Sequence, residues 1–397
     1  MAHALASRGD KVVAVGESKN MAMRWLVHAQ VFQLGYPPPE GSSGQTHQYL
    51  RGLEAHVRRG QLVFRTLAKL ASEGFRPDVV VAHPGWGEAL FLKDVFAKAR
   101  HIQYLEFFYR AEGADVGFDP EFPVSADDTA RVRVKNATQL ISFEAADGGI
   151  SPTAWQKSRY PADWQGRIAQ IHDGIDTDTV RPYLNARVVL KSDTGNQILS
   201  VADEVVTYVA RNLEPYRGIH TFLRSIPTIL AKRPKAHILI VGGDDVSYGS
   251  APPDGNSYRA RYLKEWGGDV DTSRVHFLGR IAYAQYLQVL QISTVHVYLT
   301  YPFVLSWSML EAMSAGCVVV GSNTAPVQEV IHDGHNGFLV DFFDASKLAV
   351  RVAETIAARN EMTTIRTEAR ATILENYDLK RLCLPQILDY LGSRGGH

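Results

Sequence analysis

The chain has few cysteines and no long apolar run. Cys317 and Cys383 are its only cysteines among 397 residues, too few for a disulfide framework. Cys317 opens a short apolar run and is expected to behave as a small buried hydrophobic residue. No apolar stretch approaches the roughly 18–20 residues that a membrane-spanning helix needs. The start is too short and too broken for a signal-peptide core, so we expect a soluble cytoplasmic protein.

An excess of charge of one sign is also missing. The chain has 42 Lys and Arg residues and 42 Asp and Glu residues, so its formal net charge is zero. A dedicated nucleic-acid-binding protein normally carries a basic excess, and no nucleic-acid partner is expected. The histidines lack metal-ligand spacing, so no metal site is predicted. Neither a G-x-G-x-x-G helix start nor a Walker sequence occurs, which leaves an NAD site unsupported.

What the sequence does contain is a regular alternation of two kinds of segment. Short, almost wholly apolar runs suit strands buried on both faces, and longer amphipathic stretches between them indicate helices that cover a parallel sheet. The strand candidates are residues 11–15, 79–82, 102–105, 168–171, 205–210, 237–241, 275–278, 295–299, 318–321 and 337–340. The helix candidates are residues 217–232, 282–292, 308–316 and 344–359, with further helices over 361–392.

This alternation predicts an α/β protein with two Rossmann-like, doubly wound domains. A length of 397 residues fits two domains at roughly 100–200 residues each. We expect an N-terminal domain over 1–190, a C-terminal domain over 191–375, and a helix within 376–397 that packs back toward the N-terminal domain. The boundary is placed in the polar stretch 177–204, where no clear strand is visible, and 37–44 is expected to be a surface loop.

The beginning of the chain departs from this plan. Ala2–Ser7 resembles the end of a helix, and the strand candidate 11–15 follows directly after Gly9. A doubly wound domain normally places a strand and a tight loop before such a helix. We therefore expect the N-terminal domain to lack its first strand. The upstream coding sequence should then hold an in-frame apolar strand followed by a Gly-containing loop.

The segment Tyr298–Gly316 combines a strand, a loop and a helix start. Ser308 and Glu311 have the spacing of a capping box, which would explain Glu311 without any ligand. The alternative is an anion site, because the free N–H groups and the helix dipole near Ser306 and Ser308 would hold a phosphate. A carboxylate one turn into the helix would then be placed to bind ribose hydroxyls.

Two arginines flank the end of another predicted strand. Arg211 ends the strand and Arg217 opens the next helix. Ligands bind at the carboxyl ends of parallel strands, where two guanidinium groups suit a diphosphate. Since a cation at a helix start opposes the dipole, Arg217 needs a reason to be there. The alternative is a surface arginine paired with Glu214.

A pair of glycines follows the strand candidate 237–241. Gly242 and Gly243 would let the backbone approach a ligand closely or adopt a positive φ. A plain tight turn explains them equally well.

Acidic and aromatic residues follow two strand candidates in the first half. His83, Trp86 and Glu88 come after one strand, and Glu106 comes after the other. Asp115 continues the series, although a loop turn would explain it. A lone histidine in such a place is more often structural, but aromatic rings with carboxylates also form sugar-binding surfaces.

A basic helical stretch lies between these segments. Its cations share one side of the helix, with an apolar face elsewhere; they are Arg51, Arg58, Arg59, Arg65 and Lys69. A solvated face is the plain interpretation. The alternative is weak peripheral contact with anionic lipid at the inner face of a membrane, or with a charged acceptor.

In these segments the chain resembles the retaining glycosyltransferases of family 4, which have the two-domain GT-B fold. The resemblance covers nearly the whole chain and is strongest over 203–340. Arg211 and Arg217 match the family's basic pair on the donor diphosphate, although a Lys is commoner at the second place. Gly242-Gly243 and the segment Phe277–Arg280 also match, which adds Gly279 and Arg280 to the donor-binding candidates.

The motif of two glutamates in this family is only half present. Glu311 falls on the second Glu, whose role in the family is to bind the donor ribose. The first Glu falls at Phe303, so a carboxylate usually near the donor hexose is absent, while the backbone amides of Val304 to Ser306 remain. The missing first strand is a second departure, since it lines the acceptor side in the family.

The resemblance implies transfer of a hexosyl group from a nucleotide diphosphate sugar to an acceptor hydroxyl, with retention, in polysaccharide or glycoconjugate synthesis. Arg211, Arg217 and the helix start near Ser308 would stabilise the leaving group, so no cofactor is expected. His83 and Glu106 would position a carbohydrate or glycolipid acceptor. The alternatives are a non-catalytic sugar-nucleotide-binding subunit, suggested by Phe303, and another GT-B enzyme such as an epimerase. The sequence does not indicate an oligomeric state.

Overall fold

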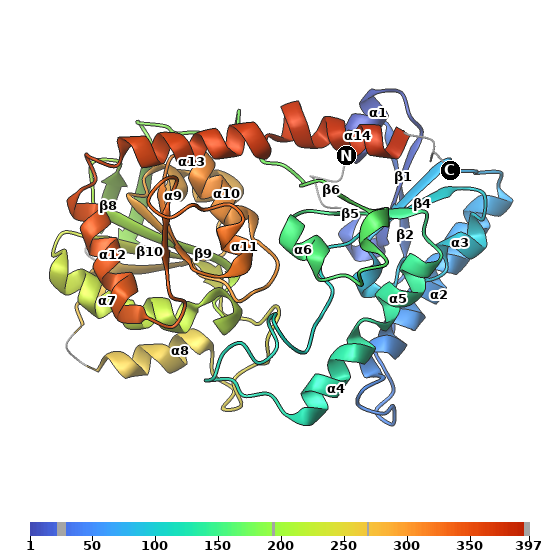
Figure 1. The fold of residues 1–397 in the computed structure, drawn as a ribbon, viewed down its shortest axis with the longest axis horizontal. Coiled ribbons are helices and arrows are strands. Elements are labelled where there is room, and N and C mark those ends of the chain that lie inside the picture. The colour runs from blue at the N-terminus through green and yellow to red at the C-terminus, as the bar shows by residue number, and fades with distance from the viewer. Residues whose placement is uncertain (22–28, 193–194, 268–269, 393–397) are drawn as a thin grey trace. The chain divides into compact units, whose positions relative to one another are not determined.

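The structure is a computed structural model that describes residues 1–397 except 22–28, 193–194, 268–269 and 393–397 (Figure 1). Its contacts divide the chain into two compact units. Unit 1 consists of Met1–Asp173 and Cys383–His397, and unit 2 consists of Gly174–Leu382. The division falls before residue 174, earlier than the expected boundary after residue 190. The helix α14 (Leu384–Gly392) belongs to unit 1, whereas residues 376–382 belong to unit 2.

Unit 2 is built on a six-stranded parallel sheet with the strand order β11-β10-β9-β12-β13-β14. All six strands were predicted, because each is a short and mostly apolar run, and the sheet largely buries its four central strands on both faces. Their bounds are β9 (Val205–Asn212), β10 (His237–Gly243), β11 (Val275–Gly279), β12 (Val295–Tyr298), β13 (Val318–Ser322) and β14 (Phe338–Val340).

Helices cover both faces of this sheet, as the pattern predicted (Figure 1). The helices α7 (Ile219–Lys232) and α12 (Ala345–Ala357) pack together on one face. On the other face lie α9 (Tyr283–Gln291), α10 (Trp307–Ser314) and α13 (Thr363–Asn376). The unit is therefore a doubly wound α/β domain.

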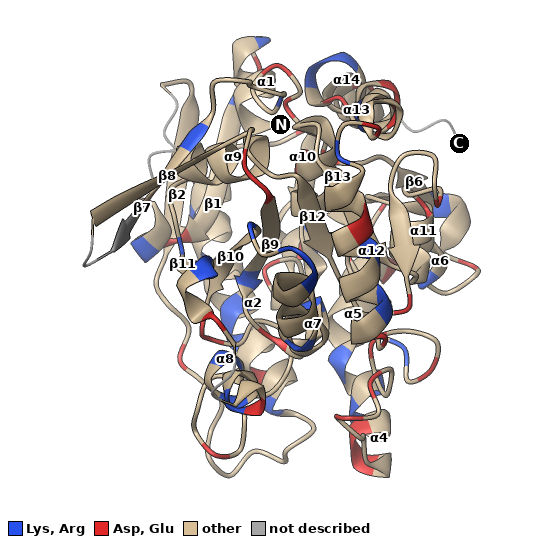
Figure 2. Cartoon of the chain, turned by 90° about the vertical axis from the view of Figure 1, so that its left-hand side faces the viewer, with Lys and Arg blue, Asp and Glu red and all other residues tan. Residues whose placement is uncertain are grey.

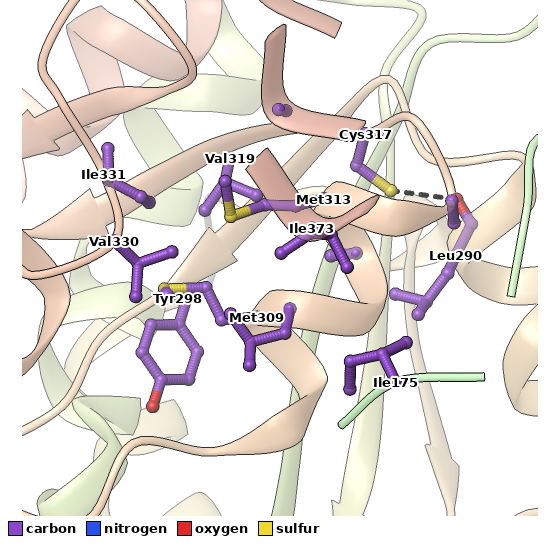
Figure 3. Packing of buried hydrophobic residues seen from close by; sticks show 14 of the residues in the cluster. Ile175, Leu290, Tyr298, Met309, Met313, Cys317, Val319, Val330, Ile331 and Ile373 are labelled. Atoms are coloured by element: carbon purple, nitrogen blue, oxygen red, sulfur yellow. Dashed lines mark hydrogen bonds between the residues drawn. The ribbon is translucent and has the colours of Figure 1, made fainter. Parts of the chain in front are cut away.

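A buried apolar cluster anchors α10 to the sheet (Figure 3). Met309 and Met313 of α10 are fully buried and pack in one cluster with Val319 of β13 and Ile373 of α13. Burial of each such side chain contributes about 1.5–3 kcal/mol. Cys317 is a free thiol in the same cluster, and its Sγ donates to the Leu290 carbonyl oxygen at 3.1 Å. The position of the α10 N-terminus is thus fixed from within the core.

An antiparallel hairpin opens unit 2, where the sequence analysis expected no strand. It pairs β7 (Arg187–Ser192) with β8 (Gly195–Ser200). That prediction was wrong because these strands bury only one face: Leu190 and Leu199 are buried, while Val189 and Ile198 stay half exposed. A strand of this kind lacks the continuous apolar run that made the central strands visible.

Unit 1 contains two parallel sheets. The first pairs β1 (Val12–Glu17) with β2 (Val31–Tyr36). The second has the order β3-β4-β5-β6 and consists of β3 (Val79–Ala82), β4 (Arg100–Tyr104), β5 (Gly148–Ser151) and β6 (Ile168–Gln170). The prediction missed β2 and β5, since their sequences Val-Phe-Gln-Leu-Gly-Tyr and Gly-Gly-Ile-Ser are not β-branched runs.

The helices of unit 1 complete its α/β character. The helix α1 (Ala2–Ser7) precedes β1, as expected, and Gly9 follows it with φ +98°. The others named here are α2 (Arg51–Ser72), α4 (Ala126–Lys135) and α5 (Ala137–Glu144). The carboxyl ends of β1, β2, β3 and β4 each lead into a segment that carries polar or aromatic side chains.

Candidate functional site

The carboxyl end of β9 in unit 2 carries an exposed cation. Arg211 is the next-to-last residue of this central strand, and its side chain faces solvent. Within the part of the chain that the structure describes, no hydrogen bond or ion pair engages its guanidinium group. The charge of Arg211 is therefore available to a ligand.

The second cation, Arg217, is buried, with 6% of its surface exposed. Its Nη1 donates to the Tyr298 hydroxyl at 3.2 Å, the Thr300 hydroxyl at 2.8 Å and the Val304 carbonyl oxygen at 2.9 Å. These acceptors are all neutral, and no carboxylate pairs with Arg217 among the described residues. A buried charge without a counter-charge is costly, so this position favours an incoming anion.

The alternative pairing of Arg217 with Glu214 is wrong. Glu214 is fully buried, and its carboxylate accepts the N–H groups of Ser247, Tyr248 and Gly249, each at 3.0 Å. These three bonds shape the 247–249 loop. They set the Tyr248 ring 5.4 Å from the Arg217 guanidinium. The carboxylate of Glu214 thus binds the backbone of the loop that covers Arg217 and does not pair with Arg217 itself.

The helix α10 begins at Trp307, with Ser306 as its N-cap. The Ser306 hydroxyl accepts the Ser308 N–H at 3.3 Å, so the predicted capping box with Ser308 at the N-cap is wrong. The reason is local: the Tyr298 hydroxyl accepts the Ser306 N–H at 2.8 Å and the Arg217 guanidinium as well. This phenol ties the start of α10 to Arg217.

Glu311 is held by two tyrosines rather than by a cap. Its Oε1 accepts from the Tyr283 hydroxyl at 2.7 Å, and its Oε2 accepts from the Tyr286 hydroxyl at 2.6 Å. Both tyrosines lie on α9, three residues apart and so on one face. Burial raises the pKa of Glu311, and the two phenol hydrogen bonds act against that shift. The spacing shows that the two tyrosines share a face of α9, but it does not show that this face meets Glu311.

The glycine pair allows two strand ends to approach closely. A Cβ on Gly242 would lie 2.8 Å from the Ala210 carbonyl oxygen, and one on Gly243 would lie 2.7 Å from the Asn212 side chain. The two glycines therefore serve the packing of β10 against the end of β9. Gly279 ends β11 with φ +65° and open space around it.

Arg280 extends the basic edge of the sheet. Its Nη2 donates to Asn212 Oδ1 at 2.8 Å and to Asp245 Oδ2 at 2.7 Å. Asn212 in turn donates to the Ser247 hydroxyl at 2.8 Å. The strand ends of β9 and β11 and the 247–249 loop are thereby linked. Figure 2 shows basic and acidic positions interspersed along the ribbon, in keeping with the balanced composition.

Phe303 is the residue at which the sequence resemblance places the first glutamate of the family motif. Its ring is 3% exposed and lies edge-on to Tyr216, with the centroids 5.3 Å apart. Tyr248 lies 5.0 Å away on another side, and the Arg217 guanidinium is 5.9 Å from the ring. Two rings of an aromatic cluster, Tyr248 and Phe303, therefore lie beside Arg217 where the resemblance would place a carboxylate.

In unit 1, the predicted residues His83, Trp86 and Glu106 lie together. His83 Nδ1 accepts the Gly85 N–H at 3.1 Å, and its Nε2 lies 3.4 Å from Glu106 Oε2. The Trp86 ring stacks beside the His83 ring with centroids 6.2 Å apart. Sequence reasoning therefore found three residues that the fold brings together.

Glu88 belongs to a charged network that sequence reasoning missed. Its Oε1 accepts from the Tyr36 hydroxyl at 2.9 Å and lies 3.7 Å from Arg59 Nε. Arg59 Nη2 also donates to Glu17 at 2.9 Å. The prediction of a solvated face was wrong for Arg59, which turns inward from α2. Glu17 ends β1, and its place at a carboxyl strand end was the available signal.

Other sequence candidates lie elsewhere or are engaged. Asp115 is buried, and its charge acts on Lys135 of α4, whose pKa is lowered by burial and raised by Asp115. Arg58 of the basic stretch pairs with Glu54 at 2.7 Å, whereas Arg65 and Lys69 are exposed.

The described ranges contain no cluster of three metal-ligating side chains. None of their helices combines the length and the apolar character needed to pass through a membrane.

Two family models match successive parts of the chain. Residues 8–180 match the glycosyl transferase family 4 group, and residues 203–358 match the glycosyl transferases group 1. Together they account for most of both units.

Curated relatives carry glycosyltransferase names. The D-inositol 3-phosphate glycosyltransferase of Streptomyces scabiei is 27% identical over 269 residues, which are 62% of this chain and 57% of that protein. The phosphatidyl-myo-inositol mannosyltransferase of Mycolicibacterium smegmatis is 26% identical over 250 residues, 56% of this chain and 60% of that protein. The matched region thus spans little more than half the length of these relatives.

Solved structures establish the fold. A sucrose-phosphate synthase from Thermosynechococcus elongatus superposes with a TM-score of 0.69 at 18% identity, over 98% of this chain and 90% of that one. HepE of Anabaena, solved with UDP and glucose, gives a TM-score of 0.64 at 18% identity, over 98% and 94%. The chain belongs to the family 4 glycosyltransferases and has their two-domain GT-B fold.

Proposed function

We propose that this protein transfers a hexosyl group from a nucleotide diphosphate sugar to an acceptor hydroxyl, with retention of the anomeric configuration. The observation that carries the proposal is the pair of cations at and just beyond the carboxyl end of β9. Arg217 is buried among neutral acceptors, and Arg211 is exposed without a partner in the described ranges. A diphosphate supplies the negative charge that both lack. The UDP complex of HepE supports the same donor class, and the names of the curated relatives support glycosyl transfer.

In this reaction the bond between the anomeric carbon and the diphosphate oxygen breaks, and a bond to the acceptor oxygen forms. Negative charge accumulates on the leaving nucleoside diphosphate. Arg211, Arg217 and the N–H groups at the start of α10 stabilise that charge, usually the largest contribution in such catalysis. The leaving phosphate oxygen accepts the proton of the acceptor hydroxyl on the same face of the sugar.

Glu311 binds the hydroxyls of the donor ribose in this proposal. The hydroxyls of Tyr283 and Tyr286 fix the carboxylate, and each oxygen keeps a further lone pair for a ligand. The arginines supply the positive charge at the diphosphate, so we propose that transfer needs no metal cofactor. Chelation with EDTA should then leave the initial rate unchanged. The acceptor is a carbohydrate or glycolipid, and the product belongs to surface polysaccharide or other glycoconjugate synthesis.

The test is Arg211→Ala, with Arg65→Ala as a matched control on an exposed arginine of unit 1. Donor affinity is measured by titration calorimetry with a panel of nucleotide sugars, and turnover by donor hydrolysis and transfer. Loss of a charge-assisted contact should weaken donor binding and lower turnover by about 10²–10³-fold, whereas the control should match the wild type. Wild-type affinity and turnover in Arg211→Ala would overturn the diphosphate assignment.

A non-catalytic sugar-nucleotide-binding subunit is the second candidate, and Phe303 favours it. The aromatic ring replaces a carboxylate beside the donor sugar, so donor binding without turnover is its signature. Wild-type protein that binds a nucleotide sugar but forms no product with any acceptor would establish this candidate.

The stereochemistry of the proposed transfer has its own test. NMR of the product's anomeric configuration distinguishes retention from inversion.

A further inference from the structure

The turn after β3 presents an aromatic ring in a fixed orientation. Trp86 is 57% exposed although it is a large apolar side chain. The His83 ring stacks beside it with an interplanar angle of 29°. Gly87 closes the turn with φ +100°, and a Cβ there would lie 2.1 Å from the His56 carbonyl oxygen. The turn therefore holds Trp86 at the surface instead of letting it collapse into the core.

Next to the Trp86 ring, His83 offers a hydrogen-bond donor and Glu106 offers an acceptor. Because His83 Nδ1 accepts the Gly85 N–H, the proton of the neutral ring is assigned to Nε2. This Nε2 atom is buried and has no hydrogen-bond partner among the described residues. Glu106 Oε2 lies 3.4 Å away, beyond a good N–H···O distance. A hydroxyl group both donates and accepts, so it could bind both side chains at once.

The nearby cation is not available to a phosphate. Arg59 directs Nη2 at Glu17, Nη1 at the Trp86 carbonyl oxygen at 3.3 Å, and Nε at Glu88. A hydrogen bond from Lys19 holds the pKa of Glu17 below its ordinary value, so this carboxylate stays ionised. Lys19 also pairs with Glu17 at 2.7 Å, so three carboxylates, Glu17, Glu88 and Glu106, face two cations, Arg59 and Lys19. The described part of this edge keeps an excess of one negative charge, which disfavours a phosphate.

We infer that this edge of unit 1 binds an uncharged carbohydrate or cyclitol ring, which stacks on Trp86 and places hydroxyls on His83 and Glu106. The apolar face of such a ring fits an exposed indole, and its hydroxyls fit the donor and acceptor pair. The nucleotide-binding elements lie on unit 2, so this ring is the acceptor; that step rests on the proposed function. The acceptor is then neutral, unlike the substrate in the name of the D-inositol 3-phosphate glycosyltransferases.

The experiment compares neutral and phosphorylated ligands on the wild type and its variants. Methyl hexosides and myo-inositol, each beside a monophosphate analogue, are tested by saturation-transfer NMR and as acceptors with a nucleotide sugar. The variants are Trp86→Ala and a control, Phe32→Ala, which removes an aromatic ring that is 58% exposed on β2. Glu106→Gln is a second, isosteric variant that keeps the fold while removing the acceptor charge.

We expect neutral rings to bind and phosphorylated ones to bind at least about tenfold more weakly, and the loss of the aromatic contact to raise the acceptor KM by about tenfold in Trp86→Ala. Donor hydrolysis and thermal stability should match those of Phe32→Ala. A phosphorylated acceptor that binds as well as a neutral one, or an unchanged acceptor KM in Trp86→Ala, would overturn the inference. A protein that binds neutral rings but no nucleotide sugar would support this site and overturn the proposed function instead.

Discussion

The carboxyl edges of the two units carry opposite charges. Unit 2 has Arg211, Arg217 and Arg280 at this edge, and unit 1 has Glu17, Glu88 and Glu106 together with the exposed Trp86. Each edge also contains residues of the other sign that are engaged by neighbouring groups: Glu214 and Asp245 in unit 2, and Arg59 and Lys19 in unit 1. In unit 2, Glu214 binds three backbone N–H groups, and in unit 1, Arg59 binds Glu17 and Glu88. The same architecture can thus serve two kinds of ligand, because the residues at the strand ends set the chemistry.

Removal of the buried cation should have the largest effect. Arg217→Met keeps the length of the side chain but removes its charge and its bonds to Tyr298, Thr300 and Val304. We expect kcat/KM to fall by about 10²–10³-fold, as for loss of one preorganised donor. Arg217→Lys should retain most of the activity, since the charge persists. Equal activity in Met and Lys variants would show that the basic edge of unit 2 does not meet an anion.

A Glu214 variant tests whether the carboxylate in the basic edge of unit 2 has a structural role. In Glu214→Gln, all three N–H groups lose a charged acceptor, and one or two of them face an amide NH2 group that cannot accept. The unfolding free energy should fall by about 2–4 kcal/mol, and donor KM should rise because Tyr248 is no longer held over Arg217. Urea denaturation measures the first effect. If Glu214→Gln unfolds like the wild type and yet loses turnover, Glu214 acts on the ligand and the comparison fails.

Replacement of Glu311 should change the free energy of unfolding by a smaller amount, and this change should depend on pH. Burial raises its pKa in the folded state, so wild-type stability relative to Glu311→Gln should fall as the pH rises through and above the ordinary glutamate range. The direction follows because the unfolded state loses that proton at the lower pH. Denaturation curves of both proteins from about pH 4 to about pH 7 cover that range and the region above it. A relative stability that increases with pH would contradict the raised pKa.

Measurement of nucleotide affinity separates the proposed role of Glu311 in donor binding from its effect on the stability of the fold. At neutral pH, Glu311→Gln should weaken nucleotide binding by about tenfold, the loss of one charge-assisted hydrogen bond. Tyr286→Phe, which leaves the carboxylate but frees one oxygen, should weaken it less. Unchanged nucleotide affinity in Glu311→Gln would mean that the tyrosine-bound carboxylate only packs α9 against α10.

How much the sequence reveals differs between the two units for a physical reason. In unit 2 the central strands of the six-stranded sheet are largely buried on both faces and appear as apolar runs, and all six strands of that sheet were predicted. In unit 1, β5 consists of Gly148–Ser151, and its two glycines are required by close packing: a Cβ on Gly149 would lie 2.5 Å from Leu105. A strand whose residues are small because its neighbours are close carries no apolar signal.

The site residues also differ in how far the sequence reveals them. The strand-end positions of Arg211, His83 and Glu106 could be predicted, because the topology places them at the edge of a sheet. The inward turn of Arg59 and the contact of Tyr283 with Glu311 could not, because each depends on which residue of another segment faces it. The N-cap at Ser306 was missed for the same reason: a tyrosine hydroxyl from β12 accepts its N–H.

The smallest expected effect concerns the exposed pair of Arg280 and Asp245. Their side chains are 62% and 75% exposed, and their atoms lie 2.7 Å apart. Asp245→Asn would release Arg280 toward the diphosphate, and because exposed pairs contribute about 0.2–1 kcal/mol, donor affinity should rise by a few-fold at most. High salt should abolish that gain, since it screens exposed charges. A matched Asp271→Asn variant, whose carboxylate pairs with Arg274 elsewhere in unit 2, should leave donor affinity unchanged. If Asp245→Asn weakened donor binding instead, the carboxylate itself would meet the ligand, and the edge of unit 2 would not be purely cationic toward its substrate.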